Sequence, residues 1–192
     1  MDVRPFRREN LSALVRFWNE EFAHFPRFIP ITGAFRAGDG LIVAVEGAEI
    51  AGLMHVGVSS EDQCRARVPG WPGGTQGYVA LFAVAKARRR RGLGTELWHS
   101  GKGALAGTKQ VVIDGDGRNP WYAKPPAFGA PWGPAVPWSD HETRKFLAMR
   151  GYGPRAKAVE FADGIVVPDA EPEKFAARQK AGVARVAEWC LF

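Results

Sequence analysis

A run of basic residues followed by two glycines is the part of this sequence best suited to bind phosphate. The run Arg88-Arg89-Arg90-Arg91-Gly92-Leu93-Gly94-Thr95 follows an apolar segment, 78–84, and precedes a segment that carries Leu97, Trp98 and Leu105. Glycines let the backbone approach a ligand closely, and the N–H groups and dipole of a helix N-terminus attract an anion. The sequence therefore predicts a strand, a glycine-containing turn and a helix that hold a chain of phosphates.

Two better-known phosphate motifs do not fit this run. Leu97 stands where a dinucleotide-binding G-x-G-x-x-G motif has its third glycine, and no strand with an acidic residue follows at the expected distance. The Gly-Lys-Ser/Thr of a P-loop does not occur. A solvated arginine run before an ordinary helix, or a patch that contacts RNA, would have the same composition. The order of the flanking elements favours phosphate binding.

Length and composition restrict the class of protein. The 192 residues suffice for one domain with a full core, and 46% hydrophobic with 24% charged residues is ordinary for a soluble globular protein. The formal charge is +6, which fits an anionic ligand, nucleic acid or a membrane surface. Cys64 and Cys190 give neither a metal-ligand spacing nor a disulfide framework. Without a transmembrane run or signal peptide pattern, we expect a cytoplasmic protein without a metal.

Hydrophobic periodicity and turn residues predict the elements that must position the basic turn. The strands expected from these signals cover residues 3–7, 41–46, 49–58, 78–84, 110–114, 156–161 and 165–167, with a tight Gly47-Ala48 turn that makes the second and third a hairpin. The helices expected begin after Asn10, after Gly92, and at a capping box over 139–142, with a last helix over 172–189. The helix that begins at the capping box is expected to run through Arg150 and stop at Gly151. Residues 59–77 and the proline- and aromatic-rich residues 118–138 are expected to form loops.

Two segments in this order of elements resemble the GCN5-related N-acetyltransferases, the GNAT family. Arg89-x-x-Gly92-x-Gly94 behind a strand that ends in Val84 resembles their acyl-CoA-binding signature, and Phe146-Leu147-Ala148-Met149-Arg150-Gly151-Tyr152 resembles their late helix. The resemblance implies an α/β (α+β) fold with a mostly antiparallel, splayed central sheet and flanking helices. It places the family domain at residues 1–168 and leaves 169–192 as a C-terminal helical extension.

The resemblance also implies acetyl-CoA as cosubstrate, bound beside the strand that precedes the turn. Backbone groups on that strand would pair with the pantetheine amides like an added strand, and N–H groups of the turn would surround the pyrophosphate. Arg89 occupies the basic position of the signature, whereas Lys86 stands where many members carry proline. The cofactor-binding residues expected are Phe82, Val84, Arg89, Arg90, Arg91, Gly92, Leu93, Gly94 and Thr95.

Acetyl transfer to an amine needs a base, because an ammonium has no lone pair. Many members carry an acidic residue on the strand before the turn. Simple alternation here places Tyr78, Ala80 and Phe82 on one face and Val79, Leu81 and Ala83 on the other, and none is acidic. The candidate catalytic residues are therefore Asp114, Asp116 and Tyr122, with Glu61, Asp62 and His141 as alternatives.

The late helix lacks the family's usual acid. Leu147 stands where members often carry a tyrosine that protonates the leaving thiolate, and leucine cannot donate a proton. A thiol pKa of about 8.5 still makes the thiolate a tolerable leaving group near neutral pH.

Three functions are compatible with these residues. The first is an N-acetyltransferase that acts on a primary amine of a small molecule or peptide by direct transfer in a ternary complex, where proximity supplies much of the rate. The acceptor pocket would then involve Trp18, the connector 22–35 and the aromatic-rich residues 118–138. The second is an acyl-CoA-binding member without catalysis, and the third is a nucleic-acid-binding module, for which no recognised motif is present. Exposed tryptophans could serve a homodimer contact, and no membrane partner is expected.

Overall fold

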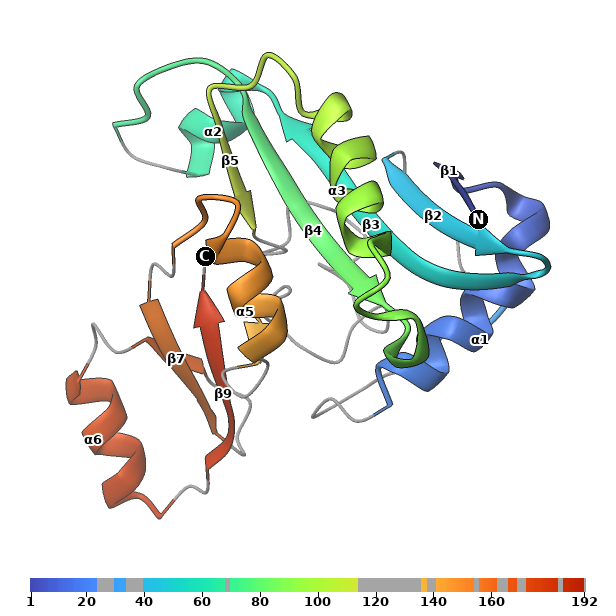
Figure 1. The fold of residues 1–192 in the computed structure, drawn as a ribbon. Coiled ribbons are helices and arrows are strands. Elements are labelled where there is room, and N and C mark those ends of the chain that lie inside the picture. Colours follow the sequence, from blue (N-terminus) through green and yellow to red (C-terminus); the bar gives the residue numbers. More distant parts are fainter. Residues whose placement is uncertain are drawn as a thin grey trace. The chain divides into compact units, whose positions relative to one another are not determined.

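A computed structural model describes residues 1–23, 30–33, 40–67, 70–113, 136–137, 141–153, 156–161, 166–168, 172–182 and 185–191. The chain divides into two compact units, Met1–Gly133 and Pro134–Phe192 (Figure 1). Within the described residues, no helix combines the length and the hydrophobicity that crossing a membrane requires.

The first unit is built on one five-stranded sheet in the order β1-β2-β3-β4-β5. Its strands are β1 (Asp2–Pro5), β2 (Leu41–Glu46), β3 (Glu49–Ser59), β4 (Gln76–Val84) and β5 (Gln110–Ile113). Neighbouring strands are antiparallel except for β4 and β5, which are parallel and therefore need the crossover helix α3 (Leu93–Ala104) between them. This mixed sheet with flanking helices confirms the predicted fold class.

Two helices cover opposite faces of this sheet (Figure 1). On one face, Leu14 and Trp18 of α1 (Leu11–Glu21) share a buried cluster with Leu53 of β3. Met54, the next residue along β3, points to the other face, where its sulfur would lie 2.5 Å from a Cβ at Gly101 of α3. The glycine therefore lets α3 lie directly on the sheet, and this packing fixes the helix whose N-terminus follows the basic turn.

A β-bulge interrupts β4 at its centre. His55 of β3 is paired with Leu81 and Val56 with Val79, so Ala80 has no partner on β3. A bulge adds one residue to one strand, which keeps the pairing on both sides of it but shifts the alternation of side chains.

The bulge overturns the alternation predicted for β4. Ala80 and Leu81 both belong to the α1 cluster, which Ala83 also contacts. Phe82 instead points toward α3. The centroid of its ring lies 5.8 Å from the ring centroid of Trp98, and the two ring planes meet at 85°. The prediction that Ala80 and Phe82 share a face is wrong, because the extra residue reverses the order of faces after it.

The connector between α1 and β2 is fixed to α1 at one point. Asn19 donates from Nδ2 to the Ile31 carbonyl (3.1 Å), and its Oδ1 accepts the Ile31 N–H (2.9 Å). Ile31 itself is buried in the α1 cluster. One side-chain amide therefore satisfies both backbone groups of a buried residue, as a neighbouring strand would.

The loop expected over residues 59–77 contains a short helix, α2 (Glu61–Arg67). Ser60 Oγ accepts the Gln63 N–H (3.2 Å), and Gln63 Oε1 accepts the Ser60 N–H (2.8 Å). This reciprocal pair is a capping box, and the Ser-x-x-Gln spacing was its signal in the sequence. The prediction of an entirely irregular loop is therefore wrong for this stretch.

The second unit contains an antiparallel sheet in the order β6-β9-β7-β8. Its strands are β6 (Val136–Pro137), β7 (Ala156–Phe161), β8 (Val166–Pro168) and β9 (Arg185–Leu191), and its helices are α5 (His141–Ala148) and α6 (Pro172–Lys180). The helix predicted over 172–189 thus ends early, because the residues after it form β9 between β6 and β7. The expected extension holds a helix and a strand, and the domain boundary at residue 168 stays a prediction.

Candidate cofactor site

The turn between β4 and α3 uses two left-handed backbone positions. Gly92, the N-cap residue of α3, has φ 85° and ψ −17°, which glycine adopts without steric cost. Arg90 has φ 63° and is the one positive-φ residue other than glycine among the described residues. These two positions turn the chain from the end of the strand into the first turn of the helix, as the sequence predicts.

The same turn leaves backbone donors unused. Thr95 and Glu96 donate their N–H groups to the Gly92 carbonyl at 2.8 and 3.1 Å. The N–H groups of residues 90–94 donate to no backbone carbonyl in the described part of the chain. Because unsatisfied N–H groups at a helix N-terminus carry partial positive charge, this stretch fits an anion.

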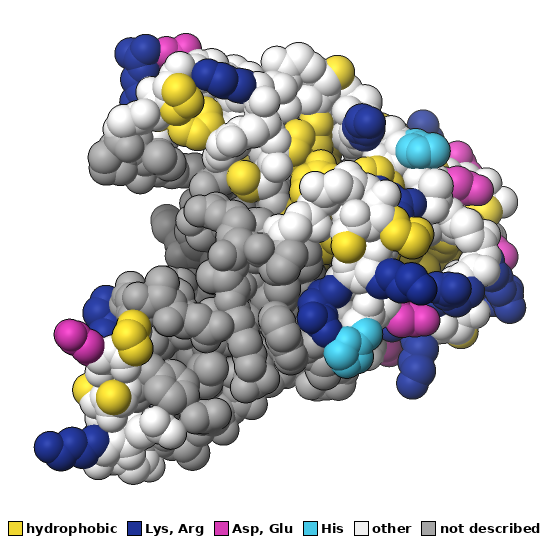
Figure 2. Space-filling view, turned by 60° about the vertical axis from the view of Figure 1, so that its left-hand side comes forward, with side chains coloured by type: hydrophobic (Ala, Val, Ile, Leu, Met, Phe, Trp, Pro, Cys, Tyr) yellow, Lys and Arg dark blue, Asp and Glu magenta, His cyan; other side chains and the backbone are white. Residues whose placement is uncertain are grey.

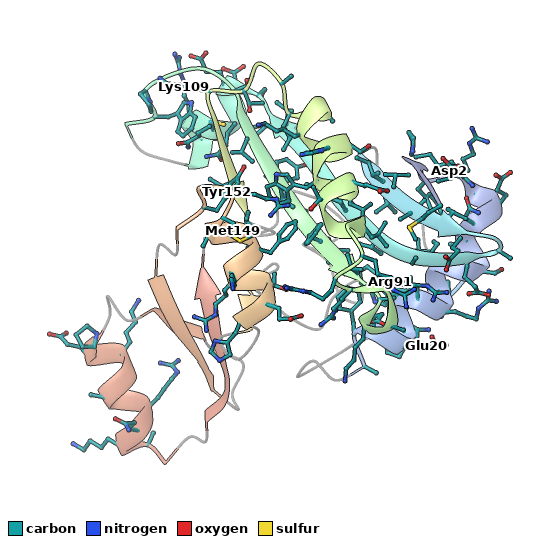
Figure 3. All side chains as sticks on the ribbon, in the orientation of Figure 1. Asp2, Glu20, Arg91, Lys109, Met149 and Tyr152 are labelled. Atoms are coloured by element: carbon teal, nitrogen blue, oxygen red, sulfur yellow. The ribbon has the colours of Figure 1, made fainter. Side chains whose placement is uncertain are left out.

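The five cations of the turn divide into paired and unpaired side chains. Arg88 lies 2.5 Å from a Glu46 carboxylate oxygen, and Arg89 lies 3.9 Å from one of Glu21. The other three cations are exposed and form no ion pair within the described ranges, and they are Lys86, Arg90 and Arg91. Figure 3 labels Arg91 beside the turn. Three unpaired positive charges next to unused N–H groups attract a polyanion.

Arg89 points back toward the end of β4. Its Nε donates to the Val84 carbonyl at 3.0 Å, and its guanidinium faces Glu21. The sequence predicts a cofactor contact for this residue, whereas here its side chain links the end of the strand to the turn. Its cofactor contact stays a prediction.

Glu21 is a residue of this site that the sequence analysis did not find. Both of its carboxylate oxygens accept the Lys86 N–H, at 3.1 and 3.2 Å, and only 21% of its side chain is exposed. It lies 65 positions before Lys86 in the chain, at the end of α1. No local pattern could reveal a contact between residues so far apart in sequence.

One edge of β4 faces away from β3 next to the turn. Ala85 donates its N–H to the Ala51 carbonyl of β3 (2.9 Å), and backbone groups alternate between edges along a strand. The N–H and C=O groups of Phe82 and Val84 therefore point away from β3. On that side, described pairing with β5 ends at Val79 and Ile113. That Phe82 and Val84 hydrogen-bond an extended ligand that carries amides stays a prediction.

The face of the sheet that α1 covers also carries polar groups near the bulge. The ring of Tyr78 lies over Gly57 of β3, where a Cβ would be 2.3 Å from the tyrosine hydroxyl. His55 lies two residues earlier on β3, which places it on the same face, and it is 3% exposed. The strand register places both residues on one face of neighbouring strands, and the sequence analysis did not name His55.

A family model described as the acetyltransferase (GNAT) family matches residues 6–108. This range covers more than half of the chain and includes the whole turn, β4 and α3. The chain belongs to the GNAT family. All nine predicted cofactor residues of this GNAT domain lie inside the matched range.

Solved structures with the same fold share little sequence with this GNAT chain. Naa20 of Chaetomium thermophilum, in complex with a bisubstrate analogue, has a TM-score of 0.56 and 19% identity over 82% of this chain and 73% of that one. Ard1 of Thermoplasma volcanium has a TM-score of 0.53 and 13% identity over 100% of this chain and 97% of that one. A transcriptional regulator of Bacillus halodurans C-125 has a TM-score of 0.52 and 14% identity over 79% of this chain and 92% of that one. These likenesses show the fold. No curated protein gives a significant match.

The structure gives no position for the three predicted catalytic residues of the GNAT domain, because Asp114, Asp116 and Tyr122 lie outside the described residues. Of the alternatives, Glu61 accepts the Gly74 N–H (3.0 Å) and pairs with Arg65, so it holds its own loop. Their catalytic roles stay predictions. Among the described residues, no three His, Cys, Asp or Glu side chains gather as a metal would require.

The late helix ends as the sequence predicts. Gly151 has φ 85°, and Tyr152 donates its N–H to the Leu147 carbonyl at 3.2 Å, which closes the helix end. Burial raises the pKa of the Tyr152 hydroxyl. Leu147 is 2% exposed in α5, which is typical of a core residue and gives no acid at this position. His141, another of the three alternative residues, contacts Arg144 at 2.5 Å on the same helix.

Proposed function

We propose that this chain transfers the acetyl group of acetyl-CoA to a primary amine of a small molecule or peptide. The observation that carries the proposal is the turn after β4. Among the described residues, its N–H groups at 90–94 donate to no backbone carbonyl, and three of its cations form no ion pair. Membership of the GNAT family supports acetyl transfer. The similarity to Naa20 with its bisubstrate analogue supports direct transfer within a ternary complex.

The geometry suggests how acetyl-CoA would lie. The N–H groups of residues 90–94 would bind its pyrophosphate, and Phe82 with Val84 would bind the pantetheine amides. The Val84 carbonyl already accepts a hydrogen bond from Arg89 Nε at 3.0 Å. The thioester would then lie farther back along β4, near the bulge at Ala80.

Binding both substrates at this place would supply much of the rate by proximity. The amine must lose a proton before it attacks the thioester carbonyl, and the thiolate of coenzyme A then leaves. Asp114, Asp116 and Tyr122 remain our proposed acid-base residues. Tyr78 and His55 are further polar groups on the face of β4 and β3 beside the bulge.

An acyl-CoA-binding protein without turnover is the second candidate. Two observations favour it: β4 carries no acidic side chain, and buried Leu147 replaces a proton donor. Nucleic-acid binding is less well supported. On the face drawn in Figure 2, Lys and Arg side chains do not form one continuous stripe, and Asp and Glu lie among them.

The first test is isothermal titration of the purified protein with acetyl-CoA at low and moderate salt. Saturable binding with one site per chain supports the proposed cofactor site, and a panel of primary amines followed by thiol release then tests turnover. Binding without turnover on any amine would favour the second candidate. A folded protein that does not bind acetyl-CoA contradicts the proposal. The cytoplasmic location and a homodimer stay predictions.

A further inference from the structure

We infer that Glu21 is a positioning residue for the cofactor turn, which it holds to the end of α1 in the shape that binds phosphate. The inference rests on the proposed function, since it assigns a role within the same acetyl-CoA site. Glu21 would act without touching the ligand, through Lys86 and Arg89.

The contacts of Glu21 fix the beginning of the turn at two points. Its carboxylate accepts the Lys86 N–H with both oxygens, at 3.1 and 3.2 Å. It also lies 3.9 Å from the Arg89 guanidinium, whose Nε donates to the Val84 carbonyl at 3.0 Å. The Glu21 carboxylate thus contacts Lys86 and Arg89, and Arg89 in turn binds the last residue of β4. Residues 90–94 follow directly from this fixed segment.

The helix that carries Glu21 is itself held rigidly. Leu14, Phe17 and Trp18 of α1 are at most 5% exposed and pack against the sheet. Trp18 also meets Phe22, the residue after Glu21, edge to face with ring centroids 4.9 Å apart. A carboxylate at the end of so well packed a helix can serve as a fixed reference for the turn.

The negative charge of Glu21 allows a positioning role to be distinguished from a purely electrostatic one. A negative charge beside a phosphate site repels the ligand, so a carboxylate without a further role should weaken binding there. The two explanations predict opposite signs for its removal. If Glu21 only adds charge, then its loss strengthens acetyl-CoA binding. If Glu21 positions the turn, its loss weakens binding.

The experiment compares three variants by isothermal titration with acetyl-CoA. Glu21→Ala removes both contacts, and we expect Kd to rise about 10-fold. Glu21→Gln keeps one oxygen that can accept the Lys86 N–H, and we expect a rise of about 3-fold. Glu20→Gln is the matched control: it removes the same charge from the neighbouring exposed residue, labelled in Figure 3, which has no ion pair within the described chain. Its Kd should stay unchanged or fall.

A salt titration and thermal unfolding separate positioning from charge and from misfolding. Loss of positioning raises the Kd of Glu21→Ala by a similar factor at low and moderate salt, whereas a pure charge effect shrinks as salt screens it. A Glu21→Ala variant that melts like Glu20→Gln but binds more weakly supports the inference. In an active enzyme, KM for acetyl-CoA should rise while kcat changes little.

Two results would overturn the inference, and they differ in what else they overturn. If the wild-type protein binds acetyl-CoA and Glu21→Ala binds it equally well or more tightly, Glu21 does not position the turn and the proposed function stands. If the folded wild-type protein does not bind acetyl-CoA, both the proposed function and the inference fail. If Glu21→Ala unfolds, the affinity of Glu21→Gln for acetyl-CoA tests the inference instead, because glutamine preserves the shape of the side chain.

Discussion

The two halves of the turn after β4 differ in what holds them. The first half, Lys86–Arg89, forms the 3₁₀ helix η2 (Lys86–Arg88) and the residue after it, and it is bound to Glu21, Glu46 and the Val84 carbonyl. The second half, residues 90–94, has neither ion pairs nor donated N–H groups within the described chain. We refer to them as the anchored half and the open half. The chain itself binds the polar and charged groups of the anchored half, whereas the proposed cofactor would bind the open half.

This division has an energetic meaning. A loop that must become ordered when it binds loses part of its affinity to that ordering. The anchored half restricts the turn before any ligand arrives, and the left-handed positions at Arg90 and Gly92 are already adopted. The open half can therefore offer its N–H groups at little further cost. The predictions below break or sharpen this contrast.

The largest effect is expected at Gly92, where a Gly92→Glu substitution would place a side chain and a negative charge in the open half. A Cβ at Gly92 meets no atom within 4 Å, so we expect the fold to survive a strain of about 1 kcal/mol. Acetyl-CoA binding should fall at least about 100-fold by titration calorimetry. Gly47→Glu is the control, since Gly47 also has positive φ and free space around it. Unchanged affinity in Gly92→Glu would show that phosphate does not bind at this turn.

The next largest effect should come from Arg91, an unpaired cation of the open half. We expect Arg91→Ala to weaken acetyl-CoA binding by about 3- to 10-fold at low salt, and by less at higher salt, because the lost attraction is electrostatic. Titrations at two salt concentrations measure both quantities. Arg8→Ala, which removes an exposed cation at the start of the chain, serves as the control. Equal losses in the two variants would mean that only net charge matters.

A smaller effect is expected for Arg89 of the anchored half, and its pattern matters more than its size. Arg89→Lys keeps the charge but loses the Nε donor to the Val84 carbonyl. If the tie to the strand is what matters, binding should weaken about 3-fold, by a similar factor at both salt concentrations. A Lys variant with wild-type affinity, beside an Ala variant whose loss disappears at high salt, would instead favour a direct phosphate contact.

The smallest effect is expected for Arg88, whose ion pair with Glu46 lies at the surface. The two side chains are 39% and 43% exposed. Such pairs contribute about 0.5 kcal/mol to the free energy of unfolding. Arg88→Ala should therefore change the equilibrium constant of unfolding and the Kd for acetyl-CoA by at most about 2- to 3-fold. Denaturant unfolding and titration measure the two. A larger loss of affinity would place Arg88 with the open half.

Local signals in the sequence predicted the parts of the fold that depend on near neighbours. The Gly47-Ala48 turn predicted the hairpin that β2 and β3 form, and the glycines after Arg91 predicted the start of α3. Gly151 likewise marked the end of the late helix. Each of these features is set by the backbone freedom of one or two residues, which the sequence displays directly.

Features set by distant partners could not be predicted. The bulge at Ala80 depends on the register between β3 and β4, and the role of Glu21 depends on a contact across 65 positions. The strand β9 formed where a helix was expected, because pairing with β6 and β7 outweighs local helix preference. The capping box at Ser60 and Gln63 is different, since its signal was present in the sequence.

The two hydrogen bonds between Asn19 and Ile31 shorten the stretch of chain that must be closed between α1 and β2. Loop closure costs conformational entropy that grows with loop length, by about 0.6 kcal/mol for each doubling. Because Ile31 is buried and bound at both backbone groups, it divides the connection between α1 and β2 into two shorter segments. A change of length in one of them need not alter the other, so the segments before and after Ile31 can vary independently in related chains.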